Sequence, residues 1–410
     1  MGSALSCCAC GCCGLCSSAA GKITQRSARI AYCGLFALSL IIAWIMREIS
    51  APLMRKISWI NTSSSTTRSD EWLEMQAVLR VSSGSFLFYT LFALVMIGVK
   101  DRKDWRDSLH HGAWTAKLIG WFILTVLMFF LPNGVMIGYG ILSIVGSGLF
   151  LLVQVIILLD FTHNWNAAWV AKDEQFWYAA LLFASVVCYL GTFTLSGLLY
   201  YWFSPSGETC SLNVFFITMT LILAVGYCVI SLHPKVNGSL LPASVISLYC
   251  AYVCYTGLSS EPRTYECNGL HNHSAAVSTS TLILGMLTTV LSVVYSAVRA
   301  GSSTTFLSPP SSPRGGSQAL LESGSKDEEN EKDESRPVAY VYSFFHIIFA
   351  LATMYSGMLL TGWTTAGNDS EQLVDVGWPS VWVRICTEWI TGGLFVWSLV
   401  APLIFPDREF

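Results

Sequence analysis

The sequence predicts an all-α protein that crosses a membrane many times, and three observations lead to this fold class. Hydrophobic residues make up 53% of the 410-residue chain and charged residues only 12%, and the mean hydropathy is +0.54. Apolar runs of about 20 residues recur, which is the length that crosses ~30 Å of hydrocarbon as a helix. Trp and Tyr gather near the ends of these runs, as in interfacial belts. Because backbone polar groups inside lipid must be paired within the segment, and the runs are too long for barrel strands, we expect helices.

Ten apolar runs are long enough to span the bilayer. In chain order they occupy residues 30–46, 78–99, 114–131, 135–161, 176–194, 212–232, 239–258, 275–299, 338–363 and 379–405. The fourth is the longest without a break, and we expect it to be a tilted helix that crosses the bundle. The predicted organisation is therefore a Cys-rich N-terminal segment (1–29), eight helices (30–299), a polar loop (300–337), two more helices (338–405) and a short tail (406–410).

The distribution of basic residues predicts the orientation. An even number of helices puts both termini on one side, and of the 23 Lys and Arg, sixteen fall on that side and seven on the other. By the positive-inside rule both termini are expected in the cytosol. The triplets that begin at Asn61, Asn272 and Asn368 fit the pattern for N-glycosylation and lie on the opposite, luminal side. A fourth such triplet, at Asn237, lies on the cytosolic side.

Two groups of cysteines have different predicted fates. Cys210 and Cys267 lie in two luminal loops, on the oxidising side of the membrane, so a disulfide between them is expected; two unrelated thiols are the alternative. Six further cysteines lie near the N-terminus. The opening residues fit the pattern for myristoylation of Gly2, and cysteines before a membrane helix are typical of palmitoylation. A zinc site is the weaker interpretation, because no His accompanies them. The six are Cys7, Cys8, Cys10, Cys12, Cys13 and Cys16.

The segment 300–337 changes abruptly to Gly, Ser and Pro and then to a run of mixed charges. Such a composition predicts a disordered cytosolic linker. Ser308 and Ser312 each precede a proline and are candidates for phosphorylation, while Leu320 and Leu321 beside acids are candidates for recognition by trafficking adaptors. A solvated tether between two parts of the membrane domain is the simpler interpretation.

Polar residues at the end of the fourth run are the principal candidate site. An ionised Asp160 at the edge of hydrocarbon requires a partner. Lys117 begins the third run on the same side of the membrane, so we expect an ion pair between them. His163 and Asn166 follow Asp160 at spacings of three and could share its helical face, and Gln154 extends the polar line deeper. The alternatives are a membrane-edge salt bridge and a site for a lipid headgroup or another substrate.

Further ionisable residues lie inside the last two runs. His346 is well inside the ninth run and is expected either to pack through a hydrogen bond or to line a polar path. Arg384 and Glu388 lie in the tenth run at a spacing of four, which allows a local ion pair. Alternatively, the Arg384 guanidinium could hold a lipid phosphate near the luminal interface.

Several function classes lack support in the sequence. The net charge is −3 and there is no basic stripe, so nucleic acid is not an expected partner. The sequence contains no Walker pattern, no HExxH or GxSxG motif and no histidine box. We therefore expect no ATP-driven pump, no enzyme of a known motif type, no metal site and no cofactor.

The pattern of residues along most of the chain resembles one family, the serine incorporators. The residues that carry the resemblance are Ala77, Val78, Arg80, Val81, Ser82, Trp114, Lys117, Gln154, Leu158, Leu159, Asp160, Phe161, His163, Trp165, Asn166, Trp169, Trp177, Tyr178, Ala179, Ala180, Asn213, Phe215, Phe216, Ile217, His233, Pro234, Lys235, Glu261, Pro262, Cys267, Asn268, Trp378, Pro379, Val381, Trp382, Val383, Ala401, Pro402 and Leu403. The resemblance implies ten transmembrane helices in two four-helix bundles, joined by a long diagonal fourth helix, with a lipid-accessible groove between them. The chain departs from the family where Ala167 replaces a common Glu, Arg384 a common Lys and Glu388 a small polar residue.

Two functional hypotheses follow from the resemblance. The first is passive movement of phospholipids between leaflets (scrambling) along polar side chains, with Lys117 and Asp160 at the cytosolic end of the path and His346 and Arg384 along the outer part. The second is a serine-delivery or scaffold protein that promotes phosphatidylserine and sphingolipid synthesis. The expected partners are membrane phospholipids and sphingolipids. Serine, lipid-synthesis enzymes and a second copy of the chain are further candidates, and the expected location is the plasma membrane or the endomembranes (ER, Golgi).

Overall fold

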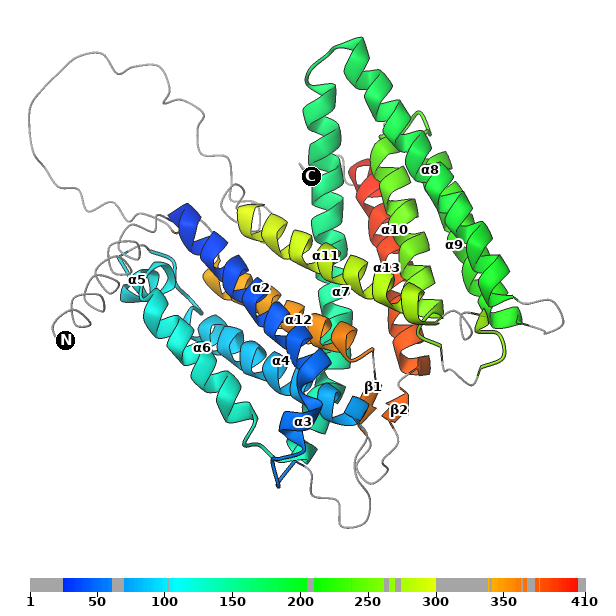
Figure 1. The fold of residues 1–410 in the computed structure, drawn as a ribbon. Helices are drawn as coiled ribbons and strands as arrows, with labels where there is room; N and C mark the ends of the chain where they lie inside the picture. The colour runs from blue at the N-terminus through cyan, green and yellow to red at the C-terminus, as the bar shows by residue number, and fades with distance from the viewer. Residues whose placement is uncertain are drawn as a thin grey trace, which may run out of the picture.

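Helices make up nearly all of the chain that the structure describes (Figure 1). The structure is a computed structural model, and it describes residues 25–60, 70–101, 103–204, 210–236, 238–261, 265–269, 274–299, 338, 341–362, 364–366, 373–375 and 377–404. The start of α2 and the end of α13 lie at the same end of the molecule, the upper end in Figure 1. We call this the terminal end and the other the far end.

The first group of helices packs around α4 (Asp70–Val95). It contains α2 (Gln25–Ile49), the short α3 (Ala51–Met54), α5 (Trp105–His111), α6 (Trp114–Met128) and α12 (Tyr342–Leu360). Aromatic side chains from α2, α4 and α12 fill its core, including Phe36, Tyr89 and Phe349. Rings bury a large apolar area with few rotatable bonds, which suits a core between close helices.

The second group of helices packs around α10 (Leu240–Leu258), which contacts α8 (Gln175–Phe203), α9 (Ser211–Ser231) and α13 (Gly377–Ile404). Its core includes Ile217, Ile246 and Phe395. The outer face of α8 is apolar instead of charged: Phe183 is 71% exposed. An exposed apolar surface of this kind is expected where the surrounding solvent is lipid.

A long helix, α7 (Asn133–Val170), contacts both groups and runs obliquely between them (Figure 1). Its 38 residues extend about 57 Å at 1.5 Å per residue. This length exceeds the ~30 Å of a hydrocarbon core, so α7 must either tilt strongly or emerge from the bilayer. The helix begins directly after Pro132, whose fixed φ and missing N–H suit a helix start. The remaining long helix, α11 (Ser274–Arg299), packs against α12, α2 and α7.

The predicted fold class, an all-α polytopic membrane protein, is confirmed. Each of the ten predicted runs overlaps a different helix of the structure. Among the described residues, eight helices are long and apolar enough to cross a membrane, or nine if the bent pair α5 and α6 forms one span. α11 contributes only a shorter apolar stretch, Ile283–Ala297. The count of ten spans, the cytosolic location of the termini and the two-bundle description therefore stay predictions.

The structure also contains a feature that the sequence did not indicate. Strands β1 (Thr364–Ala366) and β2 (Leu373–Asp375) pair in antiparallel register between α12 and α13. Three residues are too few to show a two-residue alternation of polar and apolar side chains, so periodicity does not reveal such a pair.

Several predictions fall outside the described residues and stay predictions. They concern the linker 300–337 and the tail 406–410, the acylation of Gly2 and of Cys7, Cys8, Cys10, Cys12, Cys13 and Cys16, and the glycosylation of Asn61, Asn272 and Asn368.

Close contact between α4 and α6 depends on Gly84. A Cβ atom at this position would lie 2.6 Å from the Cα atom of Thr125. Thr125 and Gly120 both belong to α6. In contrast to Gly84 on α4, a Cβ atom at Gly120 would meet nothing within 4 Å. Small residues allow helix backbones to approach closely where the hydrophobic effect does not drive association.

We expect Gly84→Ala to destabilise the protein, because the added methyl group meets backbone atoms and forces the helices apart. The cost should be about 1–3 kcal/mol, measured as a lower melting temperature in detergent micelles. Gly120→Ala is the matched control and should be neutral or slightly stabilising, since Ala is the better helix former. Equal melting temperatures for the two variants would contradict the packing described.

Candidate functional site

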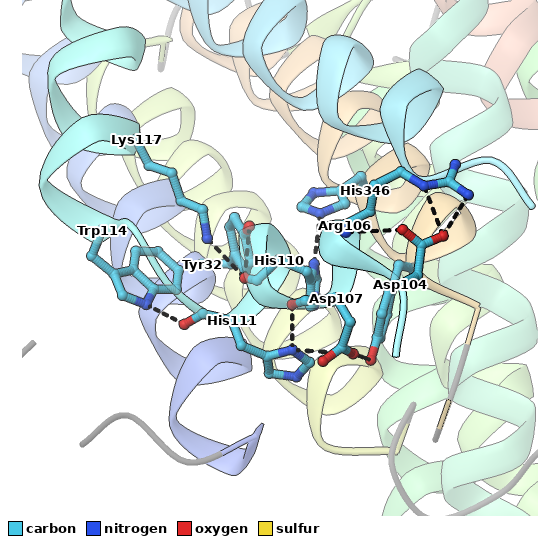
Figure 2. Close-up of polar contacts among 10 residues, drawn as sticks. Tyr32, Asp104, Arg106, Asp107, His110, His111, Trp114, Lys117 and His346 are labelled. Atoms are coloured by element: carbon cyan, nitrogen blue, oxygen red, sulfur yellow. Dashed lines mark hydrogen bonds and ion pairs between the residues drawn. The ribbon is translucent and has the colours of Figure 1, made fainter. Parts of the chain in front are cut away.

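The first polar cluster surrounds Lys117 at the terminal end of the first group (Figure 2). The Lys117 side chain is buried, and its Nζ donates a hydrogen bond of 2.7 Å to the carbonyl oxygen of His110. The same Nζ lies 4.8 Å from the ring centroid of Tyr32 and 4.2 Å from that of Trp114. A desolvated ammonium over aromatic faces gains cation–π energy of roughly 2 kcal/mol. Lys117 is thus stabilised by a carbonyl oxygen and by π systems.

Two buried histidines from distant parts of the sequence meet beside this lysine. Nδ1 of His110 lies 3.1 Å from Nε2 of His346, so one ring donates a hydrogen bond to the other. This contact requires that at least one of the two imidazoles be neutral. Tyr342 stacks on the His110 ring with centroids 4.1 Å apart, and its hydroxyl donates to Oδ1 of Asp107 at 2.5 Å. The cluster therefore joins α5 to α12.

Local structure explains how α5 holds His110 in place. Asp104 caps the start of α5 by accepting a hydrogen bond from the backbone N–H of Arg106, a common role for Asp at this position. The Arg106 guanidinium also donates to the Asp104 carboxylate, and this hydrogen bond lowers the pKa of Asp104 below its ordinary value. Ala113, with φ +54°, adopts the left-handed conformation that costs an L-residue roughly 1–2 kcal/mol and turns the chain by 76° into α6.

An apolar groove lies on the outer side of this cluster. Its volume is about 390 Å³, and its walls come from α4, α5, the turn at Ala113 and α6. Phe88, Leu91 and Ile123 are among the apolar side chains, and among the described residues Lys117 is the one charged residue that lines it.

The predicted ion pair between Lys117 and Asp160 is wrong. The hydroxyl of Tyr295 on α11 donates to Oδ2 of Asp160 at 2.8 Å, and Asn164 donates to Oδ1 at 2.9 Å. Both predicted partners do lie toward the terminal end of their helices. However, α7 is inclined to α6, so the upper end of α7 is displaced sideways from the start of α6 (Figure 1).

The predicted shared face of Asp160, His163 and Asn166 is also wrong. Asp160 contacts α11, whereas Oδ1 of Asn166 accepts a 2.6 Å hydrogen bond from Ser239, which precedes α10. Asn166 follows Asp160 by six residues, so in a helix of 3.6 residues per turn their side chains point in directions about 120° apart. His163 between them is exposed. The three side chains therefore do not converge on one ligand.

A second polar cluster lies where α7, α10, α11, α12 and α13 meet. A cavity of about 10 Å³, roughly the room that one water needs, is lined by Leu151, Gln154, Tyr249, Tyr252, Val253, Thr256, Thr288, Tyr355 and Arg384. Oε1 of Gln154 and the hydroxyl of Tyr249 are buried there without a hydrogen-bond partner in the described part of the chain. Buried polar atoms of this kind usually bind ordered water or a ligand. Gln154 and Arg384, two of the predicted site residues, thus lie together.

The neighbouring residues Arg384 and Glu388 turn away from each other. The Arg384 guanidinium donates to the backbone carbonyl of Thr256 on α10. Glu388 instead accepts a 2.7 Å hydrogen bond from the Thr220 hydroxyl on α9. The local ion pair that their spacing allowed does not form. His346 is likewise far from Arg384, because it belongs to the Lys117 cluster.

A third polar cluster lies at the far end of the second group. Cys210 and Cys267 form a disulfide between the start of α9 and the loop after α10. Beside it, Nδ2 of Asn213 donates to the Glu261 carboxylate at 3.3 Å, and Glu261 is only 3% exposed. Burial raises the pKa of Glu261 to about 8, although the hydrogen bond from Asn213 opposes this shift.

Sequence reasoning missed two further groups. The sequence patterns did not single out His110, although its distance of seven residues from Lys117, almost two helical turns, was a usable signal. Arg80 is completely buried in α4 and donates to Oε1 of Gln76 at 2.6 Å and to Oδ1 of Asn133 at 2.7 Å. No group of three or more metal-ligating side chains occurs in the described ranges.

The family model and the individual relatives that match this chain all carry the same family name. The family model "Serine incorporator (Serinc)" matches residues 5–408. A probable serine incorporator from Nematostella vectensis is 34% identical, over 94% of this chain and 91% of its own length. Serine incorporator 3 from Bos taurus is 31% identical over 98% of this chain and 97% of its own length. A probable serine incorporator from Monosiga brevicollis is 31% identical over 98% of this chain and 96% of its own length.

Double-mutant cycles should separate the polar contacts. For Asp160→Ala with Tyr295→Phe we expect an interaction energy of about 0.5–3 kcal/mol, because the two groups share a hydrogen bond. For Asp160→Ala with Lys117→Met we expect additivity within about 0.5 kcal/mol. The measurement is the free energy of unfolding in mixed micelles. A strong coupling between Lys117 and Asp160 would restore the ion pair and reject the arrangement described.

Glu261 predicts a pH dependence of stability. A carboxyl group whose folded-state pKa is raised favours the folded state when it is protonated, so its contribution is complete below about 4.5 and declines as the pH rises towards about 8. Melting temperatures should therefore fall across this interval. In Glu261→Gln, which cannot ionise, the fall should be smaller. An identical pH profile for the variant would show that Glu261 does not titrate in this range.

Proposed function

Because the chain belongs to the serine incorporator family and carries a polar cavity between its two groups of helices, we propose that it moves phospholipids passively between the leaflets of a membrane. Passive movement requires no energy source. It requires polar side chains that lower the cost of carrying a headgroup through hydrocarbon, while the acyl chains stay in lipid.

The observation that supports this proposal most directly is the set of groups around Arg384. A guanidinium binds phosphate through charge-assisted and bidentate hydrogen bonds. Gln154 and Tyr249 supply further polar groups beside it, and each has a buried atom that lacks a partner among the described residues. The cavity admits about one water, so a phosphate group enters only if the helices around it separate.

The position of the cavity fits such a separation. The five helices that line it include α7, which contacts both groups, and α10, the central helix of the second group. A shift of the second group relative to α7 would widen the cavity without breaking the aromatic core of the first group. Under this proposal Asp160 and Lys117 act separately, and His346 lies off the path.

The second candidate function is delivery of serine, or a scaffold that brings serine to lipid-synthesis enzymes. The names of the three relatives described above favour it, since each is called a serine incorporator or a probable serine incorporator. The cavity at Arg384 could accept a carboxylate after the same opening. We rank this function second, because the interrupted span found among the described helices, the bent pair α5 and α6, lies beside Lys117 and not at the cavity that contains Arg384.

A liposome assay tests the first function. Full-length protein is reconstituted with a fluorescent phospholipid, and external dithionite quenches the probe that reaches the outer leaflet. Wild type should expose the protected inner half of the probe, and Arg384→Met should slow this about tenfold, which corresponds to losing about 1.4 kcal/mol of headgroup binding. Arg55→Met is the control, since Arg55 is 45% exposed and pairs with Asp70.

Two outcomes of this assay would contradict the proposal. One is a protected fraction in proteoliposomes equal to that in empty liposomes. The other is an Arg384→Met variant that folds and behaves like wild type. Incorporation of labelled serine into lipids of cells that lack the protein addresses the second function, and an unchanged incorporation would reject it.

A further inference from the structure

A polar face runs along α9 through the second group of helices. Asn213, Thr220, Tyr227 and Ser231 are at most 2% exposed. Seven residues make almost two helical turns, so the first three lie above one another on one side of α9. Thr220 contacts α13 through Glu388, and a Cβ atom on Gly392, one turn after Glu388, would lie 2.1 Å from the Tyr227 hydroxyl. The face is therefore directed at α13.

Glu388 on α13 is the acidic group that lies opposite the middle of this face, at Thr220. Its side chain is 1% exposed, and Oε1 accepts the hydrogen bond from Thr220. Oε2 is buried and has no hydrogen-bond partner within the residues described. None of the described salt bridges includes Glu388. The residue lies in the span Ser380–Ala401, inside the apolar part of the helix.

The groups that face Glu388 supply no compensating charge. On α10 the nearest titratable side chains are Cys250 and Cys254, both buried. On α9 the group is the Tyr227 hydroxyl, which also lacks a hydrogen-bond partner among the described residues. The helix α7 contributes Val155, Leu158 and Leu159 to this core, and none of these three side chains carries a charge. The nearest cation on α13, Arg384, donates its hydrogen bond to α10 instead.

An ionised carboxylate with one hydrogen bond, inside a low-dielectric bundle, carries a large desolvation cost. A neutral carboxylic acid avoids most of this cost and gains a donor in place of an unsatisfied acceptor. We propose that Glu388 is a proton-binding site: it takes up a proton from water to become a carboxylic acid in the middle of the membrane, and it exchanges this hydrogen with water that enters from the Glu261 end of α9.

The route for exchange follows the other unpartnered atoms. Oε1 of Glu261 and Oδ1 of Asn213 at the far end, and the Tyr227 hydroxyl and Oγ of Ser231 beyond Glu388, are all buried without a partner in the parts of the chain described. Positions seven residues apart are separated by about 10.5 Å along a helix, which is too far for a direct hydrogen bond. Buried polar atoms of this kind bind internal water, so waters complete the route. The site is independent of the proposed lipid transport.

Infrared difference spectroscopy of the full-length protein in lipid nanodiscs tests the proposal. At neutral pH we expect wild type to show the carbonyl stretch of a protonated carboxylic acid that is lost in Glu388→Gln, which keeps the oxygen that accepts from Thr220. The band should shift to lower frequency after transfer to D₂O. Glu261→Gln removes any acid band that arises at the far end, and Glu174→Gln, at an exposed position just before α8, should change no acid band.

Two spectroscopic results would contradict the proposal. If the wild-type minus Glu388→Gln spectrum contains only carboxylate bands, Glu388 is ionised and the site does not hold a proton. If the acid band is present but does not shift in D₂O, the hydrated route is absent and that part of the proposal fails. Asn213→Leu provides a second variant away from the acid: it should preserve the Glu388 band and slow its shift in D₂O.

Discussion

A polar group inside the membrane must find its hydrogen-bond partner in the protein or in internal water, and this constraint shapes the whole structure. Lipid offers no hydrogen bonds, so helices satisfy the backbone and the polar side chains must meet one another. The cations show a common solution. Lys117 donates to a backbone carbonyl and lies over aromatic rings, and Arg80 donates to amide and carbonyl oxygens. Neutral acceptors of this kind remove the need to bury a carboxylate beside each cation, and they tie α5 to α6 and α4 to α7.

The same constraint explains which predictions succeeded. Hydropathy reports whether a residue lies in the membrane, so each of the ten predicted runs overlaps a helix, and the fourth run lies within the long helix α7. Hydropathy also gives an approximate depth, and Lys117 and Asp160 do lie toward the same end. It carries no information on sideways position. The oblique path of α7 separates those two residues and brings Asp160 to Tyr295, a partner that becomes identifiable only when the helices are packed.

The candidate site was predictable only in part for a related reason. Gln154 and Arg384 share a cavity because α7 and α13 pack together. His346 instead faces the interior of the first group of helices, where it meets His110. Each was recognisable as a polar residue in an apolar run. Deciding which of them share a site needs the rotation of each helix about its axis. Glu388 shows the limit most clearly, since its spacing from Arg384 favoured a local pair while the helix packing directs the two side chains to different neighbours.

The disulfide between Cys210 and Cys267 has a mechanical consequence. It joins the start of α9 to the loop that follows α10, and the backbone at Gly269 in that loop packs directly against the carbonyl of Trp202 at the end of α8. Three helices of the second group are thereby fastened together at the far end. A covalent fastening at one end converts any sideways displacement of these helices into a rotation about that end. The amplitude of such a movement would grow with distance from the disulfide. The helices of the second group would therefore separate most at the terminal end and least beside Cys210.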